Sequence, residues 1–429
     1  MAESPGRFGV LRDIGYVSFG KYGQYVITLV TLPLIARQLG THGVGLLAIG
    51  MSAYFIGSLA VDLGITSFLA AKVHDDDTDA DLGRLRGTYL AIRVTTLTVL
   101  GAALLAGLAL EVRPQVHMIL LGLFAGGVWS SSEDWLLIGQ GRFGTSTLYQ
   151  GAGRIGYLIL LVALLPRFPS ASTAMLCLLL SSLLTVALTW WDAVRTFGIP
   201  GRPVQLRRVL RIGAPVVASR TLVTSYGQGS AAVYSAVLDA ASLGLYSAGD
   251  RLVRAIQSLL DPIGFALLPR LARRRADDSF WRGSSRSLAG CVVAALIAVL
   301  GVWVAAPLLI HIMFGSAFAG AVPLLRVEVL ILPATTITSF VTTAVLPVRQ
   351  DTAGVLIGAV LGTAVAAGAL IVAIQTQSVW TLVYGTVCAE VAVALWYLAR
   401  MRWLVLRERA SRAGAGHRTI APVLEGDAS

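Results

Sequence analysis

The sequence has few charged residues and few cysteines for its length. Only 13% of its 429 residues are charged, 56% are hydrophobic, and the mean hydropathy is +0.75. Soluble domains carry about 25% charged residues, so this composition excludes a water-soluble globular protein. The three cysteines, Cys177, Cys291 and Cys388, lack the spacing of a disulfide or a metal site. We therefore expect no metal and no cofactor.

Long polar stretches are also scarce. Apolar runs of about 20 residues, enough to cross a bilayer, recur along the chain and are separated by short connectors. These connectors leave no room for a soluble domain, so the sequence predicts an all-α integral membrane protein. The twelve expected transmembrane helices lie at about 14–38, 44–70, 87–110, 116–139, 147–165, 171–192, 211–238, 244–269, 287–312, 324–347, 352–374 and 379–400.

Basic residues are distributed unevenly between the two sets of connectors. Most of the 34 lysines and arginines lie in the termini and in every second connector, whereas the opposite connectors hold Arg37, Arg113 and Arg167. Short loops rich in Lys and Arg stay in the cytoplasm, so we expect a multi-pass protein of the cell (inner) membrane with both termini cytoplasmic. The net charge of +11 then reflects topology and contact with membrane lipids. Nucleic acid is not an expected partner.

The two halves of the chain share a weak internal repeat at an offset of 199 residues. Such a repeat between segments of six spans gives two lobes of the same orientation, related by an axis along the membrane normal. We expect one six-helix lobe over 1–200 and a second over 201–429, the latter with a short cytoplasmic tail. The matched pairs are Leu39 and Leu238, Gly45 and Gly244, Leu46 and Leu245, Gly50 and Gly249, Asp62 and Asp261, and Lys21 and Arg220.

Several ionisable residues fall inside the predicted spans. Near the bilayer centre each costs at least ~2.5 kcal/mol, so such residues pair with one another or line a water-filled path. The basic candidates for binding a substrate are Lys21, Arg93, Arg154, Arg220, Arg251 and Arg254. The acidic candidates for binding a coupling ion, a proton or sodium, are Asp62, Asp250, Asp261 and Glu390.

Some of these residues have an equally good structural interpretation. Asp62 and Arg93 share a depth on consecutive spans, and Arg154 faces Glu133 or Asp134 across a tight hairpin. For these two sets we weigh structural pairing evenly against transport. Lys21, Arg220, Arg251 and Arg254 lack a full set of local partners, and for these four residues we favour a functional role.

Three segments resemble a known family. These are "YGQYVITLVTLPLIARQLGTHGVGLLAIGMSAYFIGSLAVDLGITSFL", "LGLYSAGDRLVRAIQ" and the later "LLPRLAR". They are similar to the polysaccharide biosynthesis flippases of the multidrug/oligosaccharidyl-lipid/polysaccharide exporter superfamily. The resemblance implies alternating access and transport of an undecaprenyl-diphosphate-linked saccharide to the outer leaflet. It assigns the diphosphate to Lys21, Arg220, Arg251 and Arg254.

The charges in the spans agree with an anionic lipid as substrate, because they are mostly basic and arginine binds phosphate well. A multidrug and toxin extrusion type cation-coupled exporter remains an alternative. A membrane polymerase or glycosyltransferase is less favoured, since the longest outer connector, "MFGSAFAGAVPL", is too short to build a catalytic site. A non-transporting scaffold is also compatible with the sequence. We expect a monomer and no enzyme activity.

Overall fold

The structure is a computed structural model that describes residues 7–63, 79–204, 206–273, 279–349 and 351–418. Within these ranges the chain is helical and contains no strand. The first half forms α1 (Arg7–Asp62), α3 (Asp79–Ala109), α4 (Pro114–Ser130), α5 (Asp134–Gly139), α6 (Phe143–Leu164) and α7 (Ala171–Phe197).

The second half contains more and shorter helices. It forms α8 (Leu206–Tyr226), α9 (Ser230–Tyr234), α10 (Ala240–Arg273), α11 (Ser279–Phe314), η1 (Ser316–Phe318), α12 (Ala321–Glu328), α13 (Ile331–Phe340), the π-helical turn η2 (Val341–Val345), α14 (Leu346–Arg349), α15 (Thr352–Thr376) and α16 (Val379–Arg418). Each of the twelve predicted spans coincides with one or more of these helices, which confirms the predicted all-α membrane class.

Local sequence signals explain where several helices begin, end or break. α1 is two helices joined at Gly40, whose backbone has φ 63°, a conformation that glycine adopts readily. Ser170 caps α7 by accepting a hydrogen bond from the Thr173 N–H. Asp351 caps α15 by accepting one from the Gly354 N–H.

Three predicted spans are interrupted: the span at 116–139 breaks between α4 and α5, and two others break at glycines or near a proline. The span at 211–238 breaks between α8 and α9, where Gly227 and Gly229 follow Tyr226. The span at 324–347 breaks between α12 and α13, because Pro333 has no N–H and its ring clashes with the carbonyl four residues earlier. The latter two breaks place backbone polar groups inside the helical layer.

The outer surface of the bundle is apolar. Along α11 the side chains of Val293, Ile297, Leu300, Val304 and Leu308 recur on one face and are 55–68% exposed. A stripe of this kind is unfavourable in water and suits contact with lipid. Eight helices of the described residues are long and apolar enough to cross a membrane.

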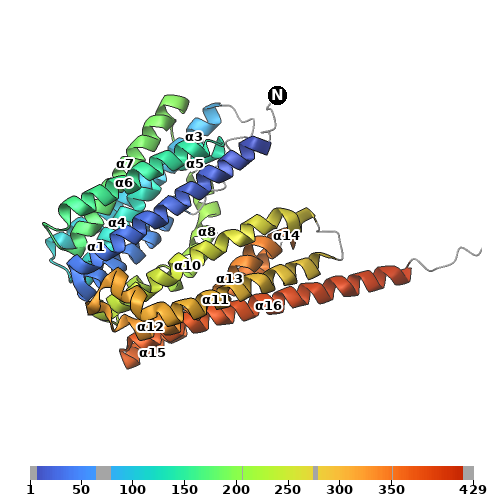
Figure 1. Cartoon of the computed structure of the whole chain (residues 1–429). Coiled ribbons are helices and arrows are strands. Elements are labelled where there is room, and N and C mark those ends of the chain that lie inside the picture. Colours follow the sequence, from blue (N-terminus) through green and yellow to red (C-terminus); the bar gives the residue numbers. More distant parts are fainter. Residues whose placement is uncertain (1–6, 64–78, 205, 274–278, 350, 419–429) are drawn as a thin grey trace, which may run out of the picture.

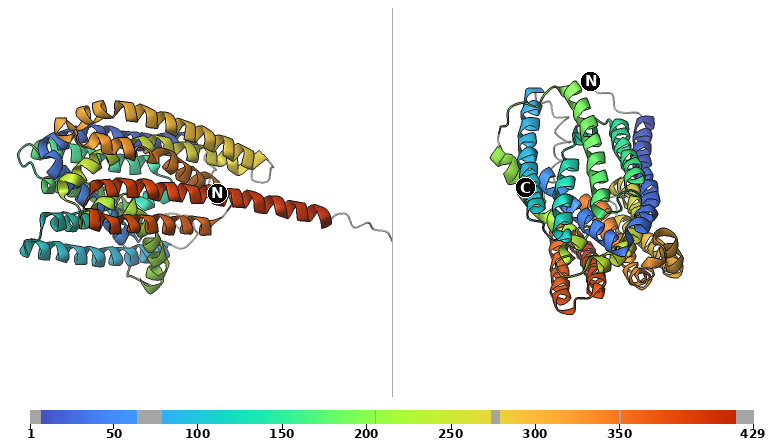
Figure 2. Two further views of the ribbon diagram at one scale, coloured as in Figure 1. Left: turned by 90° about the horizontal axis from the view of Figure 1, so that it is seen from below. Right: turned by 90° about the vertical axis from the view of Figure 1, so that its left-hand side faces the viewer.

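The helices form two groups that diverge from a common end. In Figure 1, α1 and α3–α7 occupy the upper left and α10–α16 the lower part, and the two groups meet at the lower left. Figure 2 shows α16 running on well beyond its neighbours. The groups therefore touch most closely near the turn at Gly40 and the start of α10.

Two repeat-related glycines make this contact. A Cβ atom added to Gly45 would lie 1.6 Å from the carbonyl oxygen of Ala240, and one added to Gly244 would lie 2.0 Å from that of Thr41. Thr41 and Ala240 are separated by the same offset as the two glycines. The crossing of α1 and α10 is thus nearly symmetric, and both positions need glycine.

Candidate functional site

The predicted site residues fall into separate environments. Lys21 lies on α1 and Asp261 on α10, at positions whose side chains are outside the described part of the structure. Arg220 is exposed on α8. The other predicted residues divide between a polar cluster in the first group of helices and an arginine-centred cluster on α10.

Arg93 belongs to a buried polar cluster between α3, α5 and the end of α1. Its side chain is 1% exposed, donates to Glu133 at 2.9 Å and lies 3.9 Å from Asp62. It also donates to the backbone oxygens of Ser131 and Ser132, and its guanidinium lies 4.0 Å from the centre of the Tyr89 ring. Structural pairing was one of two interpretations weighed for Asp62 and Arg93, and the two side chains do form this ion pair.

A second arginine of α3 shares the same carboxylate. Arg86 is buried, lies 3.8 Å from Glu133 and donates to the backbone oxygen of Gly198 at the end of α7. Arg86 and Arg93 are seven residues apart and so lie on one face of α3. The two cations and the carboxylates of Glu133 and Asp62 balance in charge, which suits a structural role.

Arg154 lies on α6, outside this cluster. The predicted alternative that pairs it with Glu133 is wrong, because Glu133 is taken by the two arginines of α3. Asp134 accepts a hydrogen bond from Gln150 at 2.7 Å and interacts electrostatically with Arg154. The adjacent carboxylates thus serve different partners on opposite sides of α5.

Arg251, on α10, has few partners. Among the described residues it has no hydrogen bond or ion pair, and its electrostatic neighbours are Asp250 and Tyr157. Tyr157 lies on α6, in the other group of helices. The side chain of Arg251 therefore lies near α6 of the other group.

Arg254, one turn further along α10, already has an ion-pair partner. It forms an ion pair with Asp250 at 2.8 Å and donates to the backbone oxygen of Gly227, at the break between α8 and α9, at 3.2 Å. Glu390 on α16 also interacts with it electrostatically. Arg254 is thus held in place within the second group.

Glu328, at the end of α12, joins the same cluster and was missed by the sequence analysis. Its side chain is fully buried, and both carboxylate oxygens lack a hydrogen-bond donor among the described residues. Asp250, Tyr246 and Arg254 are its electrostatic neighbours. An acid inside the apolar run "LLRVEVLILP" is the signal that could have identified it.

The arginine-centred cluster is rich in acid. Three carboxylic acids, Asp250, Glu328 and Glu390, interact with Arg254, and Asp250 also interacts electrostatically with Arg251. If all three were ionised, the cluster would hold excess negative charge in a buried place, which is costly. The arrangement can therefore hold a proton or a small cation. The described residues contain no group of His, Cys, Asp and Glu arranged for a tight metal site.

Comparisons with known proteins agree on a family and a fold. The sequence matches the family model described as polysaccharide biosynthesis protein over residues 10–274. No curated protein matches it significantly.

Solved structures of membrane transporters share the fold. The lipid II flippase MurJ in an inward closed conformation has a TM-score of 0.71 at 13% identity, covering 91% of this chain and 87% of that chain. An inward-facing multidrug resistance MATE family transporter of the MOP superfamily has a TM-score of 0.62 at 16% identity, covering 87% and 95%. A MOP superfamily transporter from Pyrococcus furiosus has a TM-score of 0.55 at 14% identity, covering 92% and 95%.

Proposed function

The chain belongs to the polysaccharide biosynthesis protein family, and we propose that it is a flippase for an undecaprenyl-diphosphate-linked saccharide. It would receive the lipid at the cytoplasmic leaflet and release it at the outer leaflet by alternating access. The observation that carries this proposal is Arg251, a cation that faces the other group of helices without an ion pair among the described residues. Such a group is suited to a diphosphate.

The other predicted cations have graded roles in this proposal. Arg154 and Tyr157 lie one turn apart on α6, so Arg154 is placed to approach the same space as Arg251. Lys21 and Arg220 are proposed to contribute charge from α1 and α8. Arg93 and Arg254 are proposed to stabilise the structure, because each already forms an ion pair with a carboxylate.

We further propose that the two lobes, 1–200 and 201–429, are the moving units. The symmetric crossing of Gly45 and Gly244 supports this division, since it relates one lobe to the other by the sequence offset. Both termini would be cytoplasmic in the inner membrane, and the chain would act as a monomer.

A coupling ion would bind at the acids around Arg254. Asp250, Glu328 and Glu390 support this assignment because three carboxylates exceed the two arginines, Arg251 and Arg254, with which they interact. Asp261 lies on the same helix, and its side chain is outside the described residues. Asp62 is a weaker candidate because Arg93 and Tyr89 already engage it.

The same acids favour a second candidate function. A cation-coupled multidrug exporter also needs buried carboxylates, and a multidrug resistance MATE family transporter shares the fold. Arg251, which has no ion pair among the described residues, makes an organic cation the poorer fit, because like charges repel where the dielectric constant is low.

The test is translocation in reconstituted vesicles. A fluorescent undecaprenyl-diphosphate-linked saccharide is incorporated, and its exposure to a membrane-impermeant quencher is followed with the wild-type protein, Arg251→Ala and Arg251→Lys. Loss of one charge-assisted contact costs about 1.5–3 kcal/mol, so Arg251→Ala should lower translocation at limiting substrate roughly tenfold to a hundredfold.

Arg326→Ala is the matched control. Arg326 lies 4.8 Å from the centre of the Trp303 ring of α11 and donates to the Trp303 backbone oxygen. This variant should translocate normally, and Arg251→Lys should fall between the two alanine variants. Wild-type rates with well-folded Arg251→Ala would overturn the role of Arg251, and no translocation by the wild type would overturn the proposed function.

A further inference from the structure

The connector between α7 and α8 is short and irregular. Residues 198–204, "GIPGRPV", follow α7, which ends at Gly198 with φ 73°. Pro200 and Pro203 have no N–H, and each pushes the residue before it toward extended backbone. The connector therefore continues neither helix, and its remaining N–H groups need partners outside it. We refer to residues 198–204 as the strap.

Backbone groups of the strap are bonded to α3. The Gly201 N–H donates to the backbone oxygen of Gly83 at 2.8 Å. Four residues further along, the Val204 N–H donates to the hydroxyl oxygen of Thr88 at 2.8 Å, and the same hydroxyl lies 2.6 Å from the Val204 backbone oxygen. Thr88 is fully buried. The strap thus lies along the first turns of α3.

The surface of α3 is shaped for this contact. A Cβ atom added to Gly87 would lie 1.8 Å from the backbone oxygen of Gly201, so a side chain at this position would displace the strap. The buried Arg86 donates to the backbone oxygen of Gly198 at 3.0 Å and lies 3.8 Å from Glu133. The strap is therefore held along its length, and its first residue is linked to the buried polar cluster.

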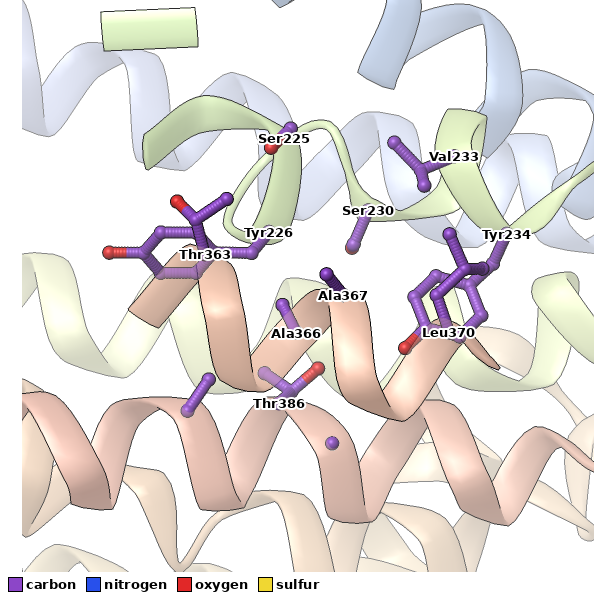
Figure 3. A pocket seen from close by; sticks show the side chains of 12 residues that line it. Ser225, Tyr226, Ser230, Val233, Tyr234, Thr363, Ala366, Ala367, Leu370 and Thr386 are labelled. Atoms are coloured by element: carbon purple, nitrogen blue, oxygen red, sulfur yellow. The ribbon is translucent and has the colours of Figure 1, made fainter. Parts of the chain in front are cut away.

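The helix that follows the strap contacts both groups of helices. α8 packs against α1 and α3 of the first group and against α15 of the second. Near its start, Val209 packs on the apolar cluster of the first group that includes Trp135. Near its end, a Cβ atom added to Gly362 of α15 would lie 2.8 Å from the ring of Tyr226. Figure 3 shows Tyr226 beside Thr363 of α15. The strap thus fixes the start of a helix that bridges the two groups.

We propose that the strap is a permanent anchor, which stays on α3 throughout the transport cycle. Residues 198–204 then move with the first lobe, and the relative movement of the lobes is taken up beyond Val204. Release of the strap would take acceptors from Thr88 and Arg86, and a buried donor without an acceptor is costly. The inference rests on the two moving lobes of the proposed function and extends the first of them from residue 200 to residue 204.

Hydrogen exchange tests the docking without any substrate. Gly87→Ala and Gly83→Ala each place one alanine in α3, one turn apart, so they share the same gain in helix propensity. Only the first should displace the strap, because a Cβ at Gly83 lies 3.9 Å from its nearest atom, the nitrogen of Gly201. Thr88→Val removes the hydroxyl without adding bulk. Thermal melting in detergent checks that each purified full-length variant is folded.

We expect the amides of Gly201 and Val204 to exchange about tenfold faster in Gly87→Ala and in Thr88→Val than in wild type. Gly83→Ala should match wild type. Mass spectrometry of the peptide that holds both amides provides the measurement. Equal exchange in all four proteins would overturn the docking, whatever the protein transports.

A disulfide then tests whether the anchor is permanent. Gly83→Cys and Gly201→Cys are combined in a background that lacks the native cysteines, since the two positions are close enough to be bridged. The oxidised protein cannot release the strap. We expect it to translocate the lipid-linked saccharide in vesicles at the rate of the same protein after reduction.

Two results would overturn the permanent anchor. Failure of the disulfide to form would contradict the docked arrangement, and translocation that stops on oxidation and returns on reduction would show that the strap must leave α3. Absence of translocation by the wild type would contradict the proposed function. In that case the exchange measurement would still decide whether the strap is docked.

Discussion

At the scale of single residues, the buried pairs divide into those that hold the bundle and those that are available for function. Arg93 and Glu133 are 1% and 3% exposed and bonded to each other at 2.9 Å, so neither can be removed without leaving a buried charge. Arg251 has no such partner among the described residues. Arg93 and Arg251 are both arginines within helices, so they differ only in whether an ion-pair partner is present.

Removal of Arg93 should therefore destabilise the protein. Arg93→Ala leaves Glu133 less well compensated, and we expect a loss of about 3–5 kcal/mol in the free energy of unfolding. The double change Arg93→Met with Glu133→Leu should be at least as destabilising as Arg93→Ala, because it also leaves the buried Arg86 without its carboxylate. Unfolding titrations in mixed detergent provide the measurement.

Arg142→Ala is the control for this prediction. Arg142 pairs with Asp192 at 2.8 Å but is 36% exposed, so its loss should cost about 0–1 kcal/mol. Equal stabilities of Arg93→Ala and Arg142→Ala would show that burial does not govern these pairs.

Glu328 offers a second prediction at this scale. Glu328→Gln keeps the shape of the side chain and removes its ability to bind a proton or a cation. We expect a folded protein whose transport no longer depends on pH or sodium as the wild type does. Glu111→Gln, in the connector between α3 and α4, serves as the control. Unchanged ion dependence in Glu328→Gln would remove this acid from the coupling site.

The sequence allowed part of the site to be predicted. A shared depth on consecutive spans raised the pairing of Asp62 with Arg93 as one of two alternatives, because depth can be counted from the ends of apolar runs, and the two side chains do lie 3.9 Å apart. It could not decide between Glu133 and Asp134 as partner of Arg154. Neighbouring helical residues point about 100° apart, so the choice depends on how α5 packs against α3 and α6.

At the scale of elements, the start of α15 is fixed from two sides. Asp351 caps the helix at Gly354 N–H and accepts hydrogen bonds from Arg400 of α16 at 2.7 and 2.9 Å. The hydrogen bonds from Arg400 and from the Gly354 backbone hold the pKa of the Asp351 carboxyl below its ordinary value. This end of α15 is therefore tied to α16 only while Asp351 is ionised.

Two substitutions separate the cap from the ion pair. Asp351→Asn keeps an N-cap acceptor and should cost up to about 1 kcal/mol, whereas Asp351→Ala should cost about 1 kcal/mol more. Because the folded-state pKa is lowered, the contribution of the ion pair is present above the unfolded value of about 3.9 and is lost as the pH falls through the folded value. Thermal melting in detergent should show the Asn variant approaching the wild type at acidic pH; a difference that persists there would refute the ionic origin.

The element boundaries show what hydropathy can and cannot predict. Each predicted apolar run coincides with one or more helices of the described residues, because crossing a bilayer requires length and composition above all. Eight of the described helices are long and apolar enough to do so. The breaks inside 211–238 and 324–347 were not predicted, since averaging over a span hides them. Gly227, Gly229 and Pro333 were the local signals, and the first two mark the place where Arg254 reaches backbone oxygen.

At the scale of the whole molecule, the crossing of Gly45 and Gly244 fixes how closely the two groups of helices approach. A Cβ atom at either position would overlap a backbone carbonyl of the other group, which cannot move aside without moving a helix. Gly45→Val should therefore separate the two groups of helices at this end and favour the state of the carrier in which they are apart there.

Spin labels at Arg37 and Asp239, both exposed near the crossing, report this separation in a background that lacks the native cysteines. The distance between the labels should increase in Gly45→Val. Gly301→Val is the control, because a Cβ there meets no atom within 4 Å. Unchanged distances in both variants would mean that the crossing does not hold the groups together.

The central claim is that this protein carries an anionic lipid-linked saccharide and not an organic cation. The most direct measurement places wild-type protein in vesicles with two substrates in parallel, a fluorescent undecaprenyl-diphosphate-linked saccharide and ethidium. We predict translocation of the lipid-linked saccharide, competition by undecaprenyl diphosphate, and no movement of ethidium above protein-free vesicles. Ethidium transport with no movement of the lipid-linked saccharide would contradict the account.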